Sequence, residues 1–262
     1  MRFCSLASGS NGNCHYVEGS GCRILIDAGL SGKRIEENMR GAGLEPASVE
    51  ALFLTHEHID HVAGAAVWAR RYRIPVYATE GTWEGMGAAR ERIPAELIRV
   101  IGNESVTELG GLRVRTMPVC HDAADPVAYS VSDCGRVCSV VTDTGVMTEE
   151  LLELLAEADL AVVESNHDLT MLMTGPYPPP LKRRVRGNLG HLSNEDCGET
   201  LAELLRVRSD ARYLLGHLSE VNNTPSLALI TSEKIVEERL GGCPEGRIYL
   251  TRRGEATGVF TI

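Results

Sequence analysis

The sequence predicts an α/β protein in which short buried strands alternate with helices along the chain. Two observations support this fold class. Short apolar runs alternate with stretches of helical periodicity, a pattern typical of layered α/β folds. Several histidines and an aspartate directly follow the predicted strands. Because sites in open α/β folds form at the carboxyl ends of strands, these residues are the first candidates for function.

The individual elements follow from local composition. We expect strands at residues 22–27, 49–54, 76–78, 112–119, 160–163 and 211–215, and a hairpin formed by residues 127–132 and 137–142. We expect helices at residues 61–72, 148–158, 193–208 and 226–240, the second with Thr148 as its N-cap. The proline-rich residues 175–180 predict a stiff loop. No linker interrupts the pattern, so we expect a single domain over residues 1–262.

Length and composition place the chain among ordinary globular proteins. It has 262 residues, of which 43% are hydrophobic, enough for a substantial core. No apolar run approaches the roughly 20 residues that span a bilayer, and the first residues lack the apolar core of a signal peptide. We therefore expect a cytoplasmic protein that does not enter a membrane.

Eight cysteines are scattered through the chain: Cys4, Cys14, Cys22, Cys120, Cys134, Cys138, Cys197 and Cys243. In a large chain without a secretory signal this distribution favours reduced thiols over disulfides. Cys134 and Cys138 have a spacing that a metal could use, but buried cysteines beside a turn are the favoured interpretation.

The net charge is −10 and the isoelectric point is about 5.3. Proteins that coat nucleic acid non-specifically are usually basic, so the charge argues mildly against that class. It does not exclude a nuclease with a local basic patch.

The motif His56-Glu57-His58-Ile59-Asp60-His61 follows the predicted strand 49–54 directly. In extended backbone, side chains two residues apart point the same way, so His56 and His58 can hold one ion. Asp60 and His61 fall where a helix begins and can face a second ion. Imidazole and carboxylate ligands suit zinc, manganese or iron.

Further candidate ligands follow other predicted strands. His121 comes after the strand 112–119, Asp143 after 137–142, and His217 after 211–215. His167 and His191 follow similar signals. Any one of them alone is more often a core or surface residue, but together they predict a metal site.

The motif set 56–61, His121, Asp143 and His217 resembles the metallo-β-lactamase fold over essentially the whole chain. Residues 8–14, 164–168, 190–194 and 216–219 resemble a bacterial subfamily known as WalJ or YycJ, related to ribonuclease Z. The resemblance implies an αββα four-layer sandwich. It also implies a 5′-to-3′ DNA exonuclease with a role in DNA repair, and therefore DNA as the partner.

The resemblance implies two divalent metal ions, zinc or manganese, with iron also allowed. His56, His58 and His121 would hold the first ion, Asp60, His61 and His217 the second, and Asp143 would bridge them. Asp60 and His191 are the predicted catalytic residues. His191 matches a non-ligand histidine of ribonuclease Z that donates a proton toward the scissile phosphate or leaving oxygen. The alternative for His191 is a helix cap, because residues 193–196 look like a helix start.

Substrate contacts are predicted from two segments and one histidine. Ser10, Asn11 and Asn13 lie in a glycine-rich loop whose amides can bind an anion, although tight turns use the same residues. Lys182, Arg183, Arg184 and Arg186 form the one dense basic run, either a clamp on the nucleic-acid backbone or a solvated face. His167 would orient a ligand or contact substrate, and Glu164 would fix His191.

Two other classes of function remain open at this point. One is a small-molecule hydrolase of the same fold, acting on a cyclic phosphodiester, a thioester or a lactone. The other is a non-catalytic protein, which the complete ligand set disfavours. The sequence does not indicate an oligomeric state.

Overall fold

The computed structural model describes residues 1–242 and 245–262. The chain folds as two compact units. Unit 1 comprises Met1–Pro118, Ala123–Val137 and Arg252–Ile262, and unit 2 comprises Val119–Asp122 and Cys138–Thr251. The single domain expected over residues 1–262 stays a prediction.

Unit 1 is built on a mixed sheet in the order β14-β1-β2-β3-β4-β5-β6. Its strands are β1 (Arg2–Ala7), β2 (Cys14–Glu18), β3 (Arg23–Ile26), β4 (Ala51–Phe53), β5 (Val76–Thr79), β6 (Ile98–Ile101) and β14 (Phe260–Thr261). The strands from β14 to β3 pair antiparallel, whereas β3 to β6 pair parallel. The carboxyl ends of the parallel strands β3 and β4 therefore meet at one edge, where the motif 56–61 begins.

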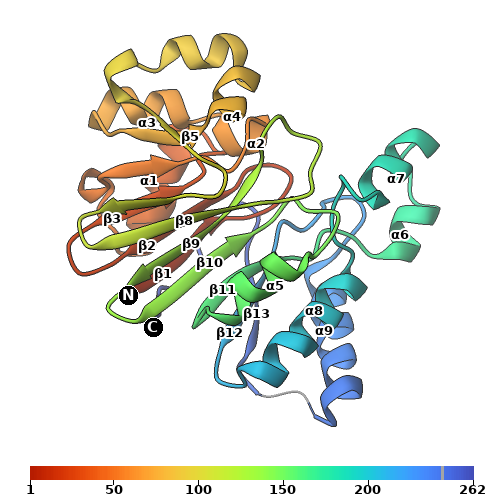
Figure 1. Cartoon of the computed structure of the whole chain (residues 1–262). Coiled ribbons are helices and arrows are strands. Elements are labelled where there is room, and N and C mark those ends of the chain that lie inside the picture. Colours follow the sequence, from red (N-terminus) through yellow and green to blue (C-terminus); the bar gives the residue numbers. More distant parts are fainter. Residues whose placement is uncertain (243–244) are drawn as a thin grey trace. The chain divides into compact units, whose positions relative to one another are not determined.

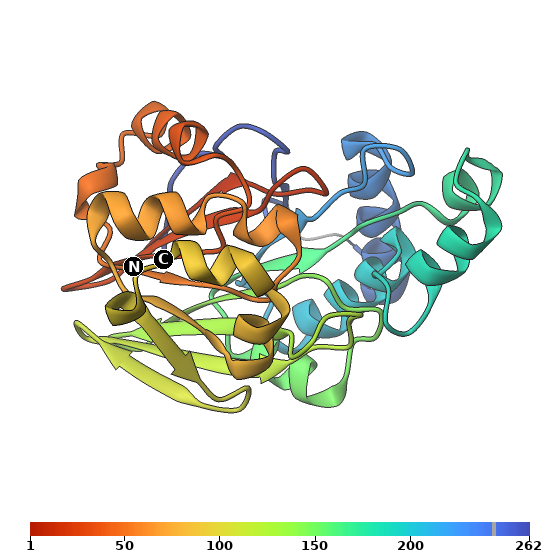
Figure 2. The ribbon, with the colours of Figure 1, turned by 90° about the horizontal axis from the view of Figure 1, so that it is seen from above.

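Helices α1 (Gly32–Gly41), α3 (Ala65–Tyr72) and α4 (Glu80–Gly85) lie together beside this sheet (Figures 1 and 2). Short 3₁₀ helices follow at Pro46–Ser48, Gly87–Arg92 and Ala95–Leu97. Trp68 and Trp83 fill the core beneath the helices, and both are fully buried. Three further strands of unit 1 pair antiparallel, namely β7 (Val106–Leu109), β8 (Leu112–Pro118) and β9 (Val127–Asp133).

The prediction of one helix over residues 61–72 is wrong, because two helices meet there. The first is α2 (Ile59–Val62), and α3 begins at Ala65. Gly64 lies between them and donates its amide to Ala28 O at 2.7 Å. A Cβ at Gly64 would come within 2.3 Å of Leu30 O, so the break is fixed by close backbone packing.

Unit 2 is built on parallel strands that adjoin in the order β13-β12-β11-β10. They are β10 (Arg136–Val141, of which the last four residues belong to unit 2), β11 (Leu160–Glu164), β12 (Arg212–Gly216) and β13 (Ile248–Leu250). Every residue of β11 is buried, as expected for a central parallel strand covered on both faces. Helices α5 (Glu149–Ala156), α8 (Asn194–Val207) and α9 (Pro225–Leu240) accompany these strands, and α8 packs along α9 (Figure 1).

Two short helices extend away from the strands of unit 2, α6 (Leu169–Thr174) and α7 (Pro179–Arg186) (Figures 1 and 2). Pro179 and Pro180 belong to the first turn of α7, so the expected loop 175–180 ends inside a helix. Proline fits there because the first amides of a helix have no partner within the helix.

Local signals explain several boundaries. Thr148 caps α5 as predicted, since its hydroxyl accepts from Leu151 N at 3.3 Å. Ser193 caps α8 and forms a capping box with Asp196. Cys134 and Gly135 both have positive φ, which suits a two-residue turn between β9 and β10.

The seven cysteines among the described residues are free thiols, as predicted, and Cys243 lies outside the described residues. Burial raises the pKa of Cys138 to about 12, while Cys134 is exposed. In the parts of the chain that the structure describes, neither belongs to a group of candidate metal ligands. No described helix is long and apolar enough to cross a membrane.

Candidate metal centre

The motif loop of unit 1 brings three imidazoles together directly after β4. The ring centroids of His56 and His58 are 4.7 Å apart, and those of His56 and His61 are 4.1 Å apart. The rings of His56 and His58 are therefore neighbours, as the predicted extended backbone requires. Asp60 Oδ2 lies 3.5 Å from His61 Nε2. The loop thus gathers three nitrogen ligands and one carboxylate.

Asp27 fixes this loop from the end of β3, and the sequence reasoning missed it. Its Oδ2 accepts from His61 Nδ1 at 2.7 Å, and its Oδ1 accepts from Thr55 N at 2.8 Å. Burial raises the pKa of Asp27, and the contact with His61 only partly offsets that effect. The signal was present, since Asp27 is the last residue of the predicted strand 22–27 and directly follows the observed β3.

Backbone contacts hold the motif loop against two neighbouring segments. Asn13 N donates to Asp60 O at 2.8 Å, and Gly29 N donates to Asn13 O at 2.8 Å. A Cβ at Gly29 would lie 1.6 Å from Asp60 O, so only glycine fits. Asn13 is fully buried, and its amide also lies 3.0 Å from His61 Nε2. Asn13 therefore braces the loop, whereas Ser10 and Asn11 are exposed at its surface.

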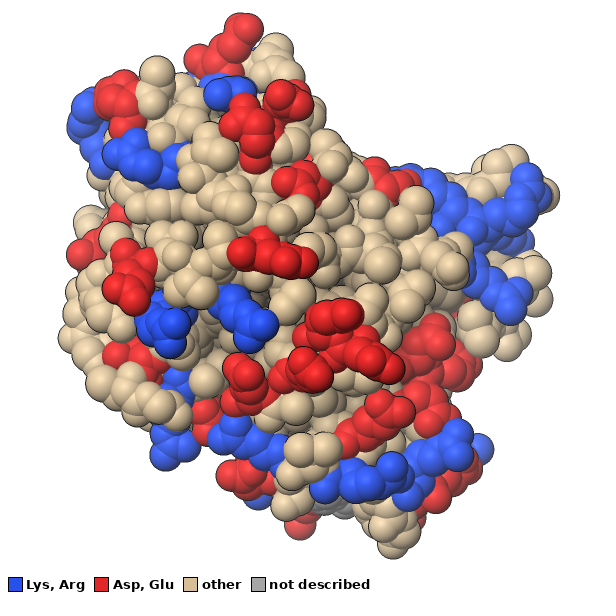
Figure 3. Space-filling view, viewed as in Figure 1, with Lys and Arg blue, Asp and Glu red and all other residues tan. Residues whose placement is uncertain are grey.

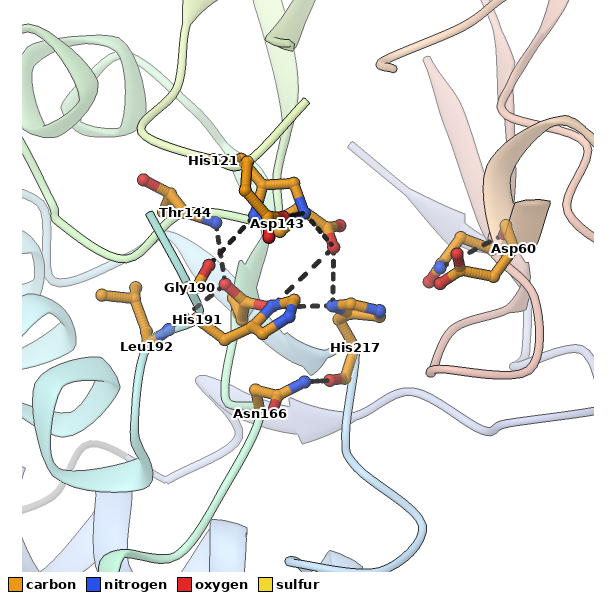
Figure 4. A network of polar contacts seen from close by, with 12 residues as sticks. Asp60, His121, Asp143, Thr144, Asn166, Gly190, His191, Leu192 and His217 are labelled. Atoms are coloured by element: carbon orange, nitrogen blue, oxygen red, sulfur yellow. Dashed lines mark hydrogen bonds and ion pairs between the residues drawn. The ribbon is translucent and has the colours of Figure 1, made fainter. Parts of the chain in front are cut away.

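In unit 2, His121, Asp143 and His217 follow β8, β10 and β12, as the sequence predicted. Their side chains are buried. His217 Nδ1 lies 3.2 Å from Asp143 Oδ1, and His121 Nε2 lies 3.8 Å from the same oxygen (Figure 4). Asp143 and His217 have φ values of 58° and 52°, and Asp27 has 62°. Non-glycine residues seldom adopt this left-handed conformation, and it concentrates at functional sites.

Glu164, at the end of β11, is the centre of the polar network in unit 2. Its Oε1 accepts from His191 Nδ1 and His217 Nδ1, each at 2.8 Å. Its Oε2 accepts from Thr144 N at 3.0 Å and Leu192 N at 3.3 Å. Burial alone would raise the pKa of Glu164, but the two imidazoles hold it well below its usual range. Ligand-capable atoms of Asp143, Glu164, His191 and His217 all lie within 4.8 Å of one another.

His191 differs from its buried neighbours in having an exposed edge. Its side chain is 17% exposed, compared with 1% for His121 and 3% for His217. Its ring lies 5.0 Å from that of His121 and 5.2 Å from that of His217. Ser193 caps α8, so the helix-cap alternative for His191 is wrong. The expected role of Glu164 in orienting His191 agrees with their hydrogen bond.

The hydrogen bonds of three histidines determine which nitrogen can bind a metal. His121 Nδ1 donates to Gly190 O at 3.1 Å, His217 Nδ1 to Glu164 and His61 Nδ1 to Asp27. Carbonyl and carboxylate oxygens only accept, so each Nδ1 carries the hydrogen and each Nε2 carries the lone pair. In His61 this lone pair accepts from Asn13 Nδ2 at 3.0 Å. Partners of this kind are typical of metal-binding histidines. A cluster of histidine and aspartate so arranged implies divalent metal ions.

His167 lies inside unit 2, with 1% of its surface exposed. Neither ring nitrogen has a hydrogen-bond partner among the described residues. Burial lowers the pKa of His167 to about 4, so the imidazole is neutral near pH 7. The structure therefore shows a buried ring at the position for which we predicted a substrate contact.

The basic run predicted as a clamp lies on α7, and its four cations occupy two different faces of the helix. The guanidinium of Arg184 forms an ion pair with Asp122, the residue after His121. Arg186 lies four residues after Lys182 and three after Arg183, so these three cations lie on another face. Arg184 therefore ties α7 to the His121 segment, while the other three cations remain at the surface of the helix.

Comparison with known sequences agrees with this arrangement. A family model described as the β-lactamase superfamily domain matches residues 22–218. The chain is 38% identical over 245 residues to exodeoxyribonuclease YycJ of Bacillus anthracis, covering 94% of this chain and 92% of that protein. It is 34% identical over 265 residues to exodeoxyribonuclease WalJ of Streptococcus pneumoniae, covering 100% and 98%.

Solved structures share the fold across the whole chain. Zinc-bound PqqB of Methylobacterium extorquens matches with a TM-score of 0.70 and 16% identity, covering 98% of this chain and 99% of that one. The short form of human tRNase Z matches with a TM-score of 0.66 and 16% identity, covering 100% of both chains. These likenesses confirm the predicted fold class, two mixed sheets sandwiched with helices.

Proposed function

Since the chain belongs to the metallo-β-lactamase superfamily, we propose that it is a metal-dependent exodeoxyribonuclease that hydrolyses DNA from the 5′ end. The observation that carries the proposal is Glu164, whose Oε1 accepts from both a candidate ligand, His217, and a partly exposed histidine, His191. The names of the two curated relatives, both exodeoxyribonucleases, support DNA as the substrate. A role in DNA repair and a place in the cytoplasm belong to the same proposal.

The ligand assignment implied by the resemblance is also part of the proposal. His56, His58 and His121 would hold one divalent ion, Asp60, His61 and His217 the other, and Asp143 would bridge them. The fixed Nδ1 hydrogens of His61, His121 and His217 support this assignment, because they direct Nε2 to the metal. Nitrogen and oxygen ligands suit zinc or manganese, and also allow iron. Bound ions of this kind activate water and stabilise charge on the phosphoryl oxygens.

The protein's own contribution to bond cleavage is proton transfer at His191. Glu164 accepts the hydrogen of His191 Nδ1, which fixes the ring and leaves Nε2 as the atom that gives a proton to the leaving oxygen. The Glu164 carboxylate stabilises the charged imidazolium in this role. The exposed edge of His191 gives a substrate access to the ring, which the buried His121 and His217 do not offer.

The variant His191→Ala tests this proposal. It should keep the metal content of the wild type, because His191 is not among the proposed ligands, and lose about 10²–10⁴-fold in DNA hydrolysis. Bis(p-nitrophenyl) phosphate is the matched control substrate, since its leaving group needs little help from an acid and should lose far less rate. Equal losses on both substrates, or loss of metal, would show that His191 is not the proton donor.

The substrate class is tested separately on the wild-type protein. End-labelled single- and double-stranded DNA and RNA should be compared across zinc, manganese and iron, beside a cyclic phosphodiester, a thioester and a lactone. Shortening of DNA from its 5′ end is expected. Turnover of the small substrates without any degradation of DNA would exclude the nuclease and favour a small-molecule hydrolase.

A further inference from the structure

The short helices α6 and α7 are joined to each other by local contacts at the edge of unit 2. Asp168 caps α6 through its side chain, which accepts from Met171 N at 2.7 Å. A Cβ at Gly175 would lie 2.5 Å from Met171 O, so the chain turns in a space that admits only glycine. Lys182 Nζ donates to Met173 O at 2.7 Å and joins α7 to the end of α6. With the prolines 176 and 178–180, these contacts hold the two helices in one arrangement.

A hollow of about 340 Å³ lies against these two helices. It is lined by Met173, Pro179, Lys182, Arg183 and Arg186. Met173 is 53% exposed, so its side chain is accessible from the hollow. Neither Arg183 nor Arg186 has a carboxylate partner among the described residues, whereas Arg184, on the other face, is paired with Asp122. The charged surface of α7 is visible as a compact blue region in Figure 3.

We propose that this hollow binds one nucleotide of a single-stranded segment of the substrate, beyond the bond that is cleaved. The base would lie against Met173 and Pro179, and the neighbouring phosphates would contact Arg183 and Arg186. The inference rests on the proposed nuclease function, and names the form of nucleic acid that the enzyme holds.

The chemistry of the lining selects this occupant. The net charge of −10 repels polyanions at long range, so a polyanion must be held by local cations such as these. Cations alone would suit any phosphate, but an exposed thioether and a proline ring add an apolar surface that suits a flat ring. Single-strand binding sites combine cations with a surface for bases in this way. In duplex DNA the bases are stacked on one another and cannot reach such a surface.

The hollow is close to His191 along the chain. His191 N donates to Val185 O at 2.9 Å, so the last turn of α7 is bonded directly to the proposed proton donor. With a rise of 1.5 Å per helical residue and the length of an arginine side chain, the hollow is on the order of 10–15 Å from the His191 backbone. At the roughly 3.4 Å per nucleotide of a stacked strand this corresponds to about three or four nucleotides, and an extended single strand spans it with fewer.

Binding of fluorescent oligothymidylate tests the proposal, with the salt concentration varied. The double variant Arg183→Gln/Arg186→Gln should bind more weakly and reduce the slope of log affinity against log salt by about 1.4, because each phosphate contact on a single strand contributes about 0.7. The variant Met173→Ala should lose about two- to tenfold in affinity with no change of slope, since it removes an apolar contact.

A matched control removes the same charge elsewhere in unit 2. Arg206 and Lys234 lie on α8 and α9, and Arg206→Gln/Lys234→Gln should bind as the wild type does. If this control weakens binding as much as the α7 variant, the effect is that of net charge and the proposal is wrong. If Met173→Ala binds with the affinity of the wild type, no base contacts Met173, and the proposal is wrong as well.

Substrate length gives a second readout that separates this inference from the proposed function. In the wild type, KM should fall as oligonucleotides lengthen from two to about six nucleotides, and this gain should disappear in the α7 double variant. The Arg206→Gln/Lys234→Gln control should keep the gain with length and should hydrolyse bis(p-nitrophenyl) phosphate as the wild type does. If the wild type degrades DNA and the α7 double variant keeps the gain with length, only the inference fails. If the wild type does not degrade DNA, the proposed function fails with it.

Discussion

Each unit contains a fully buried carboxylate that orients histidines, Asp27 in unit 1 and Glu164 in unit 2. The pKa values of these two carboxylates are shifted in opposite directions. Asp27 in unit 1 accepts from one imidazole, and burial raises its pKa. Glu164 in unit 2 accepts from two imidazoles, and its pKa is lowered despite equal burial. One imidazole does not offset the loss of hydration of a buried carboxylate, whereas two imidazoles and two backbone amides do.

The comparison also separates two tasks. Asp27 holds only a candidate metal ligand, His61, together with Thr55 of the same loop. Glu164 holds a candidate ligand and the proposed proton donor through a single oxygen. A disturbance at Glu164 is therefore expected to affect both metal binding and proton transfer, while a disturbance at Asp27 should affect metal binding alone.

The largest effect is expected from removing Asp143, the proposed bridge. Asp143→Ala should lose at least one of two ions and nearly all turnover, because a bridging carboxylate serves both metals. Elemental analysis after gentle purification measures this, with Asp210→Ala, an exposed aspartate, as the control. Full metal content in Asp143→Ala would show that the bridge is assigned wrongly.

The next largest effect is expected from Glu164→Gln, with Asp27→Asn for comparison. Each substitution replaces one carboxylate oxygen by an amide NH2 group and leaves the shape of the side chain nearly unchanged. Glu164→Gln replaces an acceptor that faces Thr144 N and Leu192 N by a donor, and should lower metal affinity or activity by about 10–100-fold. Asp27→Asn should cost less, since its new amide group faces one backbone N–H, that of Thr55, and its oxygen orients one imidazole rather than two. The two variants are compared by metal titration and by the pH profile of turnover. Equal losses in both would remove the distinction drawn between the two carboxylates.

A smaller effect is expected from the backbone that supports the unit 1 loop. Gly29→Ala would place Cβ against Asp60 O and force the loop to move, at a cost of about 1–3 kcal/mol or more in the free energy of unfolding. Gly41→Ala is the control, because nothing lies within 4 Å of its Cβ position. Denaturant unfolding checks both variants. If Gly29→Ala is as stable as Gly41→Ala, the loop does not depend on this close approach.

The smallest effect concerns His167, whose pKa falls from 6.5 to about 4 because it is buried. As the pH falls, His167 takes up a proton in the unfolded chain before it does so in the folded protein. Its contribution to the free energy of unfolding is therefore complete above about pH 6.5 and is lost as the pH falls toward 4. The loss should reach at most about 3 kcal/mol, at 1.36 kcal/mol per pH unit. Unfolding in EDTA at pH 7.5 and 4.5 measures it, and His167→Gln should lose less stability between the two. The same loss in both proteins would locate the pH dependence elsewhere.

Much of the fold and part of the site could be predicted because the signals are local. The motif 56–61 is contiguous, so its spacing shows which side chains are neighbours. The strand before His121 alternates apolar and polar residues, and those before Asp143 and His217 are mainly apolar. The rule that sites follow strands identified all three residues. The strands β1 and β2 were not predicted, since the first residues were considered only as a possible signal peptide and residues 15–18 were left unassigned.

The remaining features depend on contacts between distant segments. The role of Asn13 as a brace requires Asp60, and the ion pair of Arg184 requires Asp122, 62 residues away. The break at Gly64 arises from the backbone of residues 28–30, which no helical periodicity reveals. Asp27 is the exception, because the rule applied to Asp143 would have found it.

The left-handed backbone of Asp27, Asp143 and His217 has a consequence for the evolution of this chain. Each such residue costs of order 1–3 kcal/mol, and that cost persists only where the surroundings enforce it. Glycine would relieve the strain but would remove the side chains that the candidate metal centre uses. Selection for stability alone would therefore erode these three positions first, and their retention in a lineage would report continued selection for catalysis rather than for folding.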